Sequence, residues 1–545
     1  MSRKILSLIG MAIVMTAASE CSGQEAVSDA KQPASRITAA PQDSGSPEKI
    51  KGPAWLAEGP IYNVSASYYK GGLSELVRWV PHLKETGIRT IYLMTIWSDN
   101  SYTPDDYFKI SPNCGTEDDL KALVRAVHEH DMKILLDLVT GYSNGKPENV
   151  IHTRHPEWHL KDKDGRIPRF HPNRWGPAID RSNPEVIKYF AEVAKHYVEK
   201  FDIDGWRIDA PQNNYSPKVI DGDHSATELL RQVKRAITSV KADAVLLVEL
   251  PGPTCEGNLA AEPLFDEMCE ASYDWFLIGQ TQVKDDNSDA VPKEIKEAFL
   301  RLKQRYGGGE KPCPADVDVR RISAWAKEEF GIEIKSRRDL RKVQAQLLVK
   351  NGSPRGFADE ILKGKATSTD LVNFFRDETI LHHRTRVRWF ENHDTHARAM
   401  RVYRDQWKNL LVLISTVPGV PMIHAGQETG ELEADRFSRK IDEGTKGYFR
   451  KVFSIRSAHP ALRRGSISNA WRSGDPAFAY VRGVAEEKVV VALNFNKEPA
   501  VCTVHVPFAG EARDELSEET FRVTKSEDLE LTVPAFGARI LAAKR

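Results

Sequence analysis

The stretch FDIDGWRIDA, residues 201–210, reads as a buried strand that ends by presenting Arg207 and, two residues later, Asp209. A guanidinium close to a carboxyl group favours the charged form of that acid. We therefore expect Arg207 to hold Asp209 ionised, as a nucleophile has to be. The stretch predicts a reactive acid at the end of a strand in a sheet.

Two other apolar runs deliver acids in the same way. AVLLVEL, residues 244–250, carries Glu249, and RVRWFENHD, residues 386–394, ends in His393 and Asp394. Parallel strands present their carboxyl ends at one edge of a sheet or at one face of a barrel. One parallel scaffold would therefore bring the three acids together.

Strand-like runs alternate with amphipathic helical segments from Ile61 to about Glu428. Continuous apolar strands are typical of a parallel sheet that helices cover on its outer side. The sequence therefore predicts an α/β fold, a (β/α)8 TIM barrel, whose active site lies where the strands end. The expected strands are residues 61–68, 88–94, 133–139, 201–210, 244–250, 271–276, 386–394 and 419–428. The expected helices are residues 73–85, 117–130, 184–198 and 227–240.

Three departures from this rhythm define the domain organisation. We place the barrel at 53–461, with an irregular excursion at 140–183, after strand three, that is rich in His, Pro, Gly, Arg and Trp. A charged helical insertion covers 279–385, and we interpret its basic helices as solvated faces rather than a nucleic-acid reader. Residues 462–545 alternate apolar and polar positions between turns, which predicts a C-terminal antiparallel β-sandwich domain.

Bulk composition excludes some partners. The chain has 545 residues, with Lys plus Arg and Asp plus Glu equal at 77 each, so no global field favours nucleic acid or an anionic membrane. The six cysteines are scattered without metal-ligand spacing. Composition is compatible with a globular enzyme and with a carbohydrate binder.

The first residues have the pattern of a secretory leader. Two basic residues precede an uncharged apolar run, residues 5–18, which is too short for a permanent membrane helix. We interpret residues 1–21 as a signal peptide, with simple secretion and lipid attachment at Cys21 as equal alternatives. Residues 22–52 lack aromatic side chains and predict a flexible linker. We expect an exported protein that is periplasmic, secreted or lipid-anchored at the cell envelope.

The motifs resemble the α-amylase family of glycoside hydrolases, family thirteen, from about residue 60 onward. The matching positions are Gly205, Arg207 and Asp209 on strand four, Glu249 and Gly252 on strand five, and FENHD, residues 390–394, on strand seven. Three supporting segments agree, and these are YTPDDYFKI (102–110), PGVPMIHAGQE (418–428) and HPALRRG (459–465).

The resemblance implies a retaining mechanism on α-linked glucosides. Asp209 would be the nucleophile, and Glu249, with a raised pKa, would be the general acid and then the general base. Asp394 would stabilise the oxocarbenium-like transition state. Arg207 and His393 would support the same sugar subsite.

Aromatic contacts to the sugar follow from the same resemblance. Tyr102 stands where the family has the aromatic that stacks on the sugar. Strand three of the family ends Asp-x-Val-x-Asn-His, but this chain has Gly141 and Tyr142 in place of the asparagine and histidine. Tyr142 would be an aromatic substitute in substrate binding.

Calcium is not expected, because the missing asparagine is a calcium ligand of the family and Gly141 has no side-chain oxygen. Four histidines gather in the excursion, but their spacing matches no zinc motif. We therefore expect neither a metal nor another cofactor.

The main functional hypothesis is an exported glycosidase that hydrolyses α-glucosidic bonds, α-1,4 in the first place, of starch, glycogen or maltooligosaccharides. Gln212 and Asn213 replace the Lys-His pair that the family often has for the acceptor sugar, so a transglycosylase of the same family is an alternative. A non-catalytic glucan-binding protein is the alternative from another class.

Overall fold

The computed structural model of the chain describes most of the barrel and the C-terminal domain. The described residues are 52–97, 102–162, 164–171, 174–211, 226–250, 269–274, 326–328, 330–335, 339, 367–369, 371–372, 375, 385–394, 400, 403–431, 440–474, 478–524 and 527–544. The predicted signal peptide with Cys21, the linker up to residue 51, most of the insertion, Gln212 and Asn213 lie outside them. No helix within these ranges is long and apolar enough to cross a membrane.

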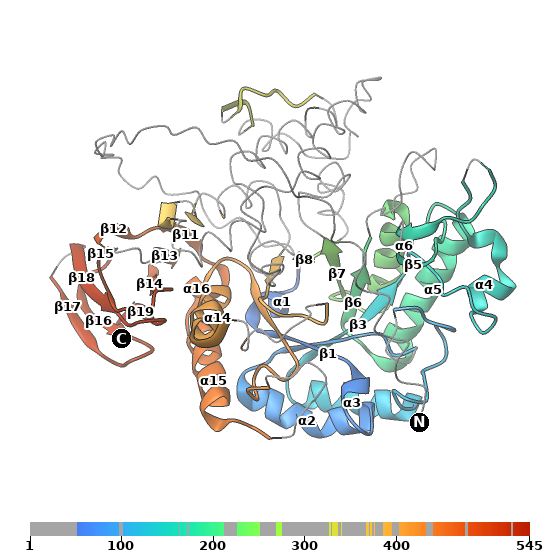
Figure 1. Cartoon of the computed structure of the whole chain (residues 1–545), viewed down its shortest axis with the longest axis horizontal. Coiled ribbons are helices and arrows are strands. Elements are labelled where there is room, and N and C mark those ends of the chain that lie inside the picture. Colours follow the sequence, from blue (N-terminus) through green and yellow to red (C-terminus); the bar gives the residue numbers. More distant parts are fainter. Residues whose placement is uncertain are drawn as a thin grey trace, which may run out of the picture. The chain divides into compact units, whose positions relative to one another are not determined.

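Eight parallel strands close into a barrel, which confirms the predicted (β/α)8 fold (Figure 1). Each strand pairs with the next barrel strand along the chain, and the last strand pairs with the first. The strands are β1 (Ile61–Val64), β2 (Thr90–Leu93), β3 (Lys133–Val139), β6 (Gly205–Asp209), β7 (Val245–Leu250), β8 (Ala271–Asp274), β9 (Thr385–Arg388) and β10 (Val420–His424).

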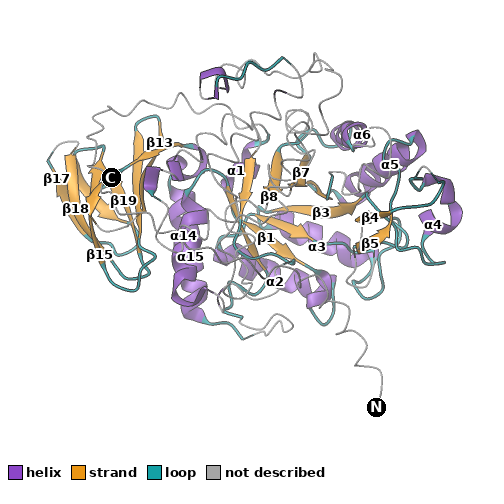
Figure 2. Ribbon diagram, turned by 45° about the horizontal axis from the view of Figure 1, so that its top comes forward, coloured by secondary structure: helices purple, strands orange, loops and turns teal. Residues whose placement is uncertain are grey.

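Amphipathic helices cover the outside of the barrel (Figure 2). Helix α3 shows the pattern: its buried residues Leu120, Leu123, Val124 and Val127 lie on one face of a helix that a capping box at Thr116 begins. The helices are α1 (Ala54–Glu58), α2 (Leu73–Thr86), α3 (Glu117–Glu129), α5 (Pro184–Phe201), α6 (Thr227–Thr238), α14 (Trp407–Thr416), α15 (Glu443–Ala458) and α16 (Pro460–Arg464), with short 3-10 turns η1 (Ala66–Tyr68) and η3 (Arg404–Gln406).

Strand β6 is shorter than the expected strand at 201–210. Helix α5, capped by Asn183, continues to Phe201, whose side chain is buried, and Asp202 then ends the helix in a left-handed conformation with φ 59°. Gly205 opens the strand because a Cβ at this position would lie 2.2 Å from the carbonyl oxygen of Val245. The absent side chain lets β6 pair closely with β7, and this places Asp209 next to Glu249.

Apolar side chains fill the interior of the barrel. Leu135, Leu247, Trp389 and Met422 belong to this inner cluster, and helix α1 contributes Leu56 to it. The barrel is therefore a packed core, and the reactive side chains lie at its carboxyl-terminal face.

The excursion after β3 contains α4 (Val150–Arg154), η2 (Pro156–Trp158), β4 (Arg169–His171) and β5 (Arg174–Pro177), and Figure 2 shows β4 and β5 next to β3. Its last segment returns along the residues that follow β3. Tyr142 bridges to Ala178, and the amide of Ile179 donates to the carbonyl oxygen of Gly141 at 2.9 Å. The excursion is thereby joined to the residues at the end of a barrel strand.

The C-terminal domain consists of two antiparallel sheets, as predicted. Their orders are β11-β13-β14-β19-β16-β17 and β12-β15-β18. The strands are β11 (Ser466–Asn469), β12 (Trp471–Gly474), β13 (Phe478–Val484), β14 (Glu487–Leu493), β15 (Ala500–Val506), β16 (Gly510–Asp514), β17 (Thr520–Val523), β18 (Glu527–Val533) and β19 (Ala538–Ala543).

Two buried arginines join the C-terminal domain to the barrel, and we call Arg456 and Arg482 the joint pair. Arg482 donates to the carbonyl oxygens of Thr416 and Gly465, and Arg456 donates to that of Gly419 at 2.7 Å. Within the described residues, neither guanidinium has a carboxylate at ion-pair distance. Burial lowers the pKa of both side chains to about 9.

Candidate active site

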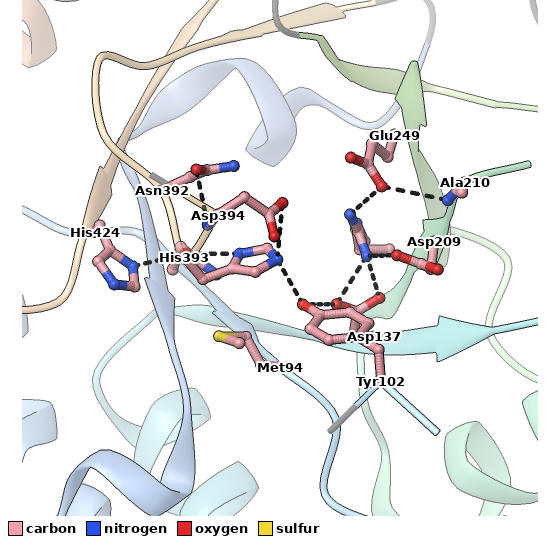
Figure 3. Close-up of polar contacts among 12 residues, drawn as sticks. Met94, Tyr102, Asp137, Asp209, Ala210, Glu249, Asn392, His393, Asp394 and His424 are labelled. Atoms are coloured by element: carbon pink, nitrogen blue, oxygen red, sulfur yellow. Dashed lines mark hydrogen bonds and ion pairs between the residues drawn. The ribbon is translucent and has the colours of Figure 1, made fainter. Parts of the chain in front are cut away.

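Arg207 is the centre of a buried cluster of three carboxyl groups. It donates from Nη1 to Asp137 Oδ1 at 2.8 Å and to Asp209 Oδ1 at 2.9 Å, and from Nη2 to Glu249 Oε2 at 2.5 Å. The acids come from the adjacent strands β3, β6 and β7, so the barrel itself aligns them. Figure 3 shows Asp137, Asp209 and Glu249 converging on one point.

The three acids differ in their access to solvent. The Asp137 side chain is 0% exposed, whereas those of Asp209 and Glu249 are 11% and 12% exposed. A ligand can therefore reach Asp209 and Glu249, while the Asp137 side chain is closed to solvent. The cluster therefore contains two accessible acids and one buried acid.

The cluster contains three carboxyl groups but only one guanidinium, that of Arg207. Burial raises the pKa of the Asp209 carboxyl well above its usual range, Arg207 opposes this rise, and the charges of Glu249 and Asp137 add to it. Arg207 favours the ionised form of Asp209, as expected, but this one guanidinium is shared by three carboxyl groups. Such a cluster retains a proton that it can transfer.

Ala210 fixes the turn directly after Asp209. Its φ of 36° lies in the left-handed region, which is uncommon for a residue with a side chain. Its amide donates to Glu249 Oε2 at 3.3 Å. The backbone after one reactive acid therefore positions the other.

Tyr102 lies beside the cluster, where the sequence places the aromatic that stacks on the sugar. Its hydroxyl donates to Asp137 Oδ2 at 2.8 Å, and Tyr92 donates to the same oxygen at 2.5 Å. Its ring stacks on His393 with a centroid distance of 5.2 Å and an interplanar angle of 10°. Tyr102 thus connects the Arg207 cluster to the segment that follows β9.

His393 is neutral in this position. Burial lowers its pKa to about 4, and the charge of Arg207 contributes to the fall. Its Nε2 lies 2.8 Å from the Tyr102 hydroxyl oxygen and 3.4 Å from Asp394 Oδ2.

Asp394 is the most exposed acid of the site, with 46% of its side chain exposed. Its amide donates to Asn392 Oδ1 at 3.0 Å, which fixes the turn that carries it. Its charge contributes to the raised pKa of Asp209. Figure 3 shows Asp394 on the His393 side of the site, across from Glu249 and Asp209.

Tyr142, the predicted aromatic substitute, is almost fully buried, with 3% exposed. Its ring lies 5.3 Å from that of Phe170. Burial raises the pKa of its hydroxyl, and the charges of Asp209 and Glu249 contribute. Tyr142 therefore lies near the acids, and its contact with substrate stays a prediction.

The residues at the end of β3 do not fit the calcium of the family. A Cβ at Gly141 would lie 2.5 Å from Cε2 of the Phe170 ring, so an asparagine side chain has no room there. Among the described residues, no group of three or more His, Cys, Asp or Glu side chains could hold a metal. Phe170 occupies the space that an asparagine ligand would need.

Three residues of the site were not predicted from the sequence: Asp137, Tyr92 and Asn63. Asn63 Oδ1 lies 2.8 Å from His424 Nδ1 and 3.3 Å from His393 Nδ1, so it joins β1, β10 and the segment after β9. Asp137 had a signal, since it heads the strand-three motif, but Tyr92 and Asn63 had none beyond their place on barrel strands.

Comparisons with known proteins identify similar sequences and folds. The family model of the α-amylase catalytic domain matches residues 51–164. The cyclomaltodextrinase of Geobacillus thermopakistaniensis is 29% identical over 213 residues, which are 36% of this chain and 34% of that protein. The intracellular maltogenic amylase of Bacillus subtilis is 29% identical over 210 residues, 36% of this chain and 33% of that protein. The chain thus spans about one third of the length of these relatives.

Solved structures are similar over more of the chain. A noncanonic maltogenic α-amylase from Thermotoga neapolitana superposes with a TM-score of 0.62 at 19% identity, covering 89% of this chain and 99% of that chain. An α-amylase from Geobacillus thermoleovorans, solved with acarbose, gives a TM-score of 0.61 at 18% identity, covering 90% and 99%. At these identities the likeness concerns the fold. Together with the motifs at the strand ends, these matches show that the chain is similar to the α-amylase family.

Proposed function

We propose that this protein is a retaining glycoside hydrolase that cleaves α-1,4 glucosidic bonds of starch, glycogen or maltooligosaccharides. One observation carries the proposal: Asp209 and Glu249 reach solvent side by side while both bind one guanidinium. Such a close pair suits a double displacement, in which one acid attacks carbon while the other transfers a proton. The names of the curated relatives support the substrate class.

In the first step, Asp209 attacks the anomeric carbon while the bond from that carbon to the glycosidic oxygen breaks. Glu249 gives its proton to the departing oxygen, so no free alkoxide forms. In the second step, water attacks the anomeric carbon and gives a proton to Glu249, and the ester to Asp209 breaks. The sugar leaves with its original anomeric configuration, and both acids return to their first state.

The remaining side chains act on the charge that develops. Asp394, exposed at the other side of the site, would hold sugar hydroxyls and face the positive charge of the oxocarbenium-like transition state. Neutral His393 would donate a hydrogen bond there, and the Tyr102 ring would contact the sugar. Arg207, fully buried, aligns the two reactive acids.

The test is incubation with maltotriose, maltoheptaose, cyclodextrins, starch and glycogen, with product length and anomeric configuration read by NMR. We expect shorter α-configured products from the wild type and at least a roughly ten-thousandfold lower rate from Asp209→Asn. Inverted products would refute the retaining mechanism, and an undiminished rate in Asp209→Asn would refute the nucleophile. Products longer than the substrate would identify a transglycosylase, and glucan binding without turnover would identify a binding protein.

We also propose that the chain is exported, on the strength of the apolar leader at residues 1–21. The relative from Bacillus subtilis carries the word intracellular in its name, so location has to be measured for this chain itself. Fractionation of cells with and without the leader, combined with labelled palmitate and a Cys21→Ser variant, separates the alternatives. Envelope association lost in Cys21→Ser indicates a lipid anchor, and protein retained in the cytoplasm with its leader contradicts export.

A further inference from the structure

Arg181 is a buried cation that the proposed mechanism does not use. It lies at the end of the excursion, two residues before the cap of α5, and is 1% exposed. Its Nη1 donates to the carbonyl oxygen of Ala210 at 3.0 Å. Its guanidinium carbon lies 5.2 Å from the centre of the Phe170 ring, within the range of a cation–π contact.

These two contacts connect Arg181 to both reactive acids. Ala210 follows Asp209 directly and adopts a left-handed conformation, and its amide donates to Glu249. Its carbonyl group and its amide are therefore held from opposite sides, by Arg181 and by Glu249. These two groups belong to successive peptide units on either side of the Ala210 Cα, so a shift of Arg181 would change the backbone torsion angles at Ala210 and move the reactive acids relative to each other.

Phe170 lies between Arg181 and Gly141, the position where the family has its calcium-binding asparagine. The Arg181 guanidinium lies over the face of the Phe170 ring, and the same ring fills the space beside Gly141. The same residues thus exclude the metal ligand and supply a positive charge that is part of the chain. Val139, Tyr142, Phe170 and Ala210 pack in one apolar cluster around this point.

We propose that Arg181 is a positioning residue that takes the place of a bound metal, by tying the excursion to the catalytic strand and holding Ala210 in its strained conformation. The site then needs no calcium for its shape. The positioning part of this inference rests on the proposed hydrolase function, whereas the independence from calcium can be tested on folding alone.

The first experiment measures thermal unfolding of the full chain with calcium and with EDTA, which requires no activity. We expect the same Tm in both, and the same rate on maltoheptaose. A rise in Tm with calcium, or a loss with EDTA, would overturn the inference. A wild type that unfolds alike in both solutions but cleaves no glucan would refute the proposed function while the calcium result stands.

The second experiment compares Arg181→Ala, Arg181→Lys and Arg482→Ala, the last being a matched truncation of a buried arginine outside the site. For Arg181→Ala we expect kcat to fall by roughly ten- to hundredfold with little change in KM, because the acids are misplaced. We also expect the acidic limb of its pH–rate profile to shift, and millimolar guanidinium to restore part of the rate. Arg482→Ala keeps the kcat and pH profile of the wild type below its Tm.

The Lys variant separates charge from geometry and remains usable if the Ala variant does not fold. A single ammonium group lacks the planar fork of arginine, so we expect Arg181→Lys to recover stability but only part of kcat. A variant at position 181 that loses Tm while its kcat and pH profile stay those of the wild type would show a merely structural role and overturn the positioning assignment.

Discussion

Arg207 in the catalytic cluster and the joint pair, Arg456 and Arg482, are all buried, yet their neighbours differ in kind. Arg207 contacts three carboxyl groups, which raise its pKa further. The joint pair contacts backbone carbonyl groups, and burial lowers the pKa of each arginine to about 9. The first environment has surplus negative charge and can move a proton, whereas the second has only dipoles and can hold two domains together.

The largest effect is expected for Arg207→Met, which leaves three acids without a counter-charge. We expect kcat to fall by about a thousandfold, and the free energy of unfolding at pH 7 to fall by about 3–5 kcal/mol. The acids of the folded variant then bind protons more tightly than those of the unfolded chain, so stability recovers as pH is lowered. Urea unfolding at pH 7 and pH 5 measures this, and a stability loss independent of pH would contradict the shared-charge description.

Glu249→Gln removes one acid of the cluster and keeps its shape. On maltoheptaose we expect a loss of about 10²- to 10⁴-fold, because proton donation is lost. On α-glucosyl fluoride, whose leaving group needs no proton, the loss should be small. The acidic limb of the pH–rate profile should also move to lower pH, since Asp209 loses a negative neighbour. Equal losses on both substrates would contradict the assignment of Glu249 as the acid, and Asp209→Asn, inactive on both, is the control.

Arg482→Met tests the joint pair in the same way. We expect the free energy of unfolding to fall by about 2–3 kcal/mol, because buried carbonyl groups lose their donor. The loss should be nearly constant between pH 5 and pH 8, since no carboxylate is released, and kcat well below the unfolding temperature should not change. A changed kcat would show that the joint pair and the catalytic cluster are coupled.

Asp204 is the opposite case to the Arg207 cluster, because it is one buried acid surrounded by several basic side chains. It accepts from His128 Nε2 at 2.8 Å and from Lys133 Nζ at 2.9 Å, and it pairs with Lys241. Burial raises its pKa, but the hydrogen bonds from His128 and Lys241 outweigh this and lower it to about 2.

The depressed pKa of Asp204 stabilises the folded state above about pH 4 by about 2 kcal/mol, a contribution that is lost as pH falls towards 2. Asp204→Asn should remove this part of the acid sensitivity. Urea unfolding from pH 6 to pH 2.5 measures it, with Asp202→Asn, at a position with an exposed side chain, as the control. An unchanged slope in Asp204→Asn would contradict the assignment.

The sequence predicts this fold well where local patterns decide it. Strand β3 has the predicted bounds, and α2 differs from its predicted range by one residue. Hydrophobic periodicity fixes such elements without help from distant residues. The short strands β11, β12, β16 and β17 show the alternating pattern least clearly, because most of their positions are at least partly exposed and each strand is only four or five residues long.

The sequence predicted the individual residues of the site, but it did not predict that three carboxyl groups share one guanidinium. Arg207 and Asp209 are two residues apart, so their pairing was visible in the sequence. Asp137 reaches the same guanidinium from 70 residues away, through the register of β3 against β6. A long-range contact of this kind determines how one charge is divided, and no local pattern reports it.

Closure of the barrel has to wait until both of its end strands, β1 and β10, have been synthesised. Strand β1 pairs with β10, and the Asn63–His424 contact that accompanies this pairing joins residues 361 positions apart. At a synthesis rate of about 5–20 residues per second, β1 waits roughly 20 to 70 seconds for its partner to be made. During that interval one edge of β1 offers unpaired backbone groups to any other strand. The closed ring that protects the mature protein therefore cannot form until β10 has been made, and a holding chaperone would be most useful in that interval.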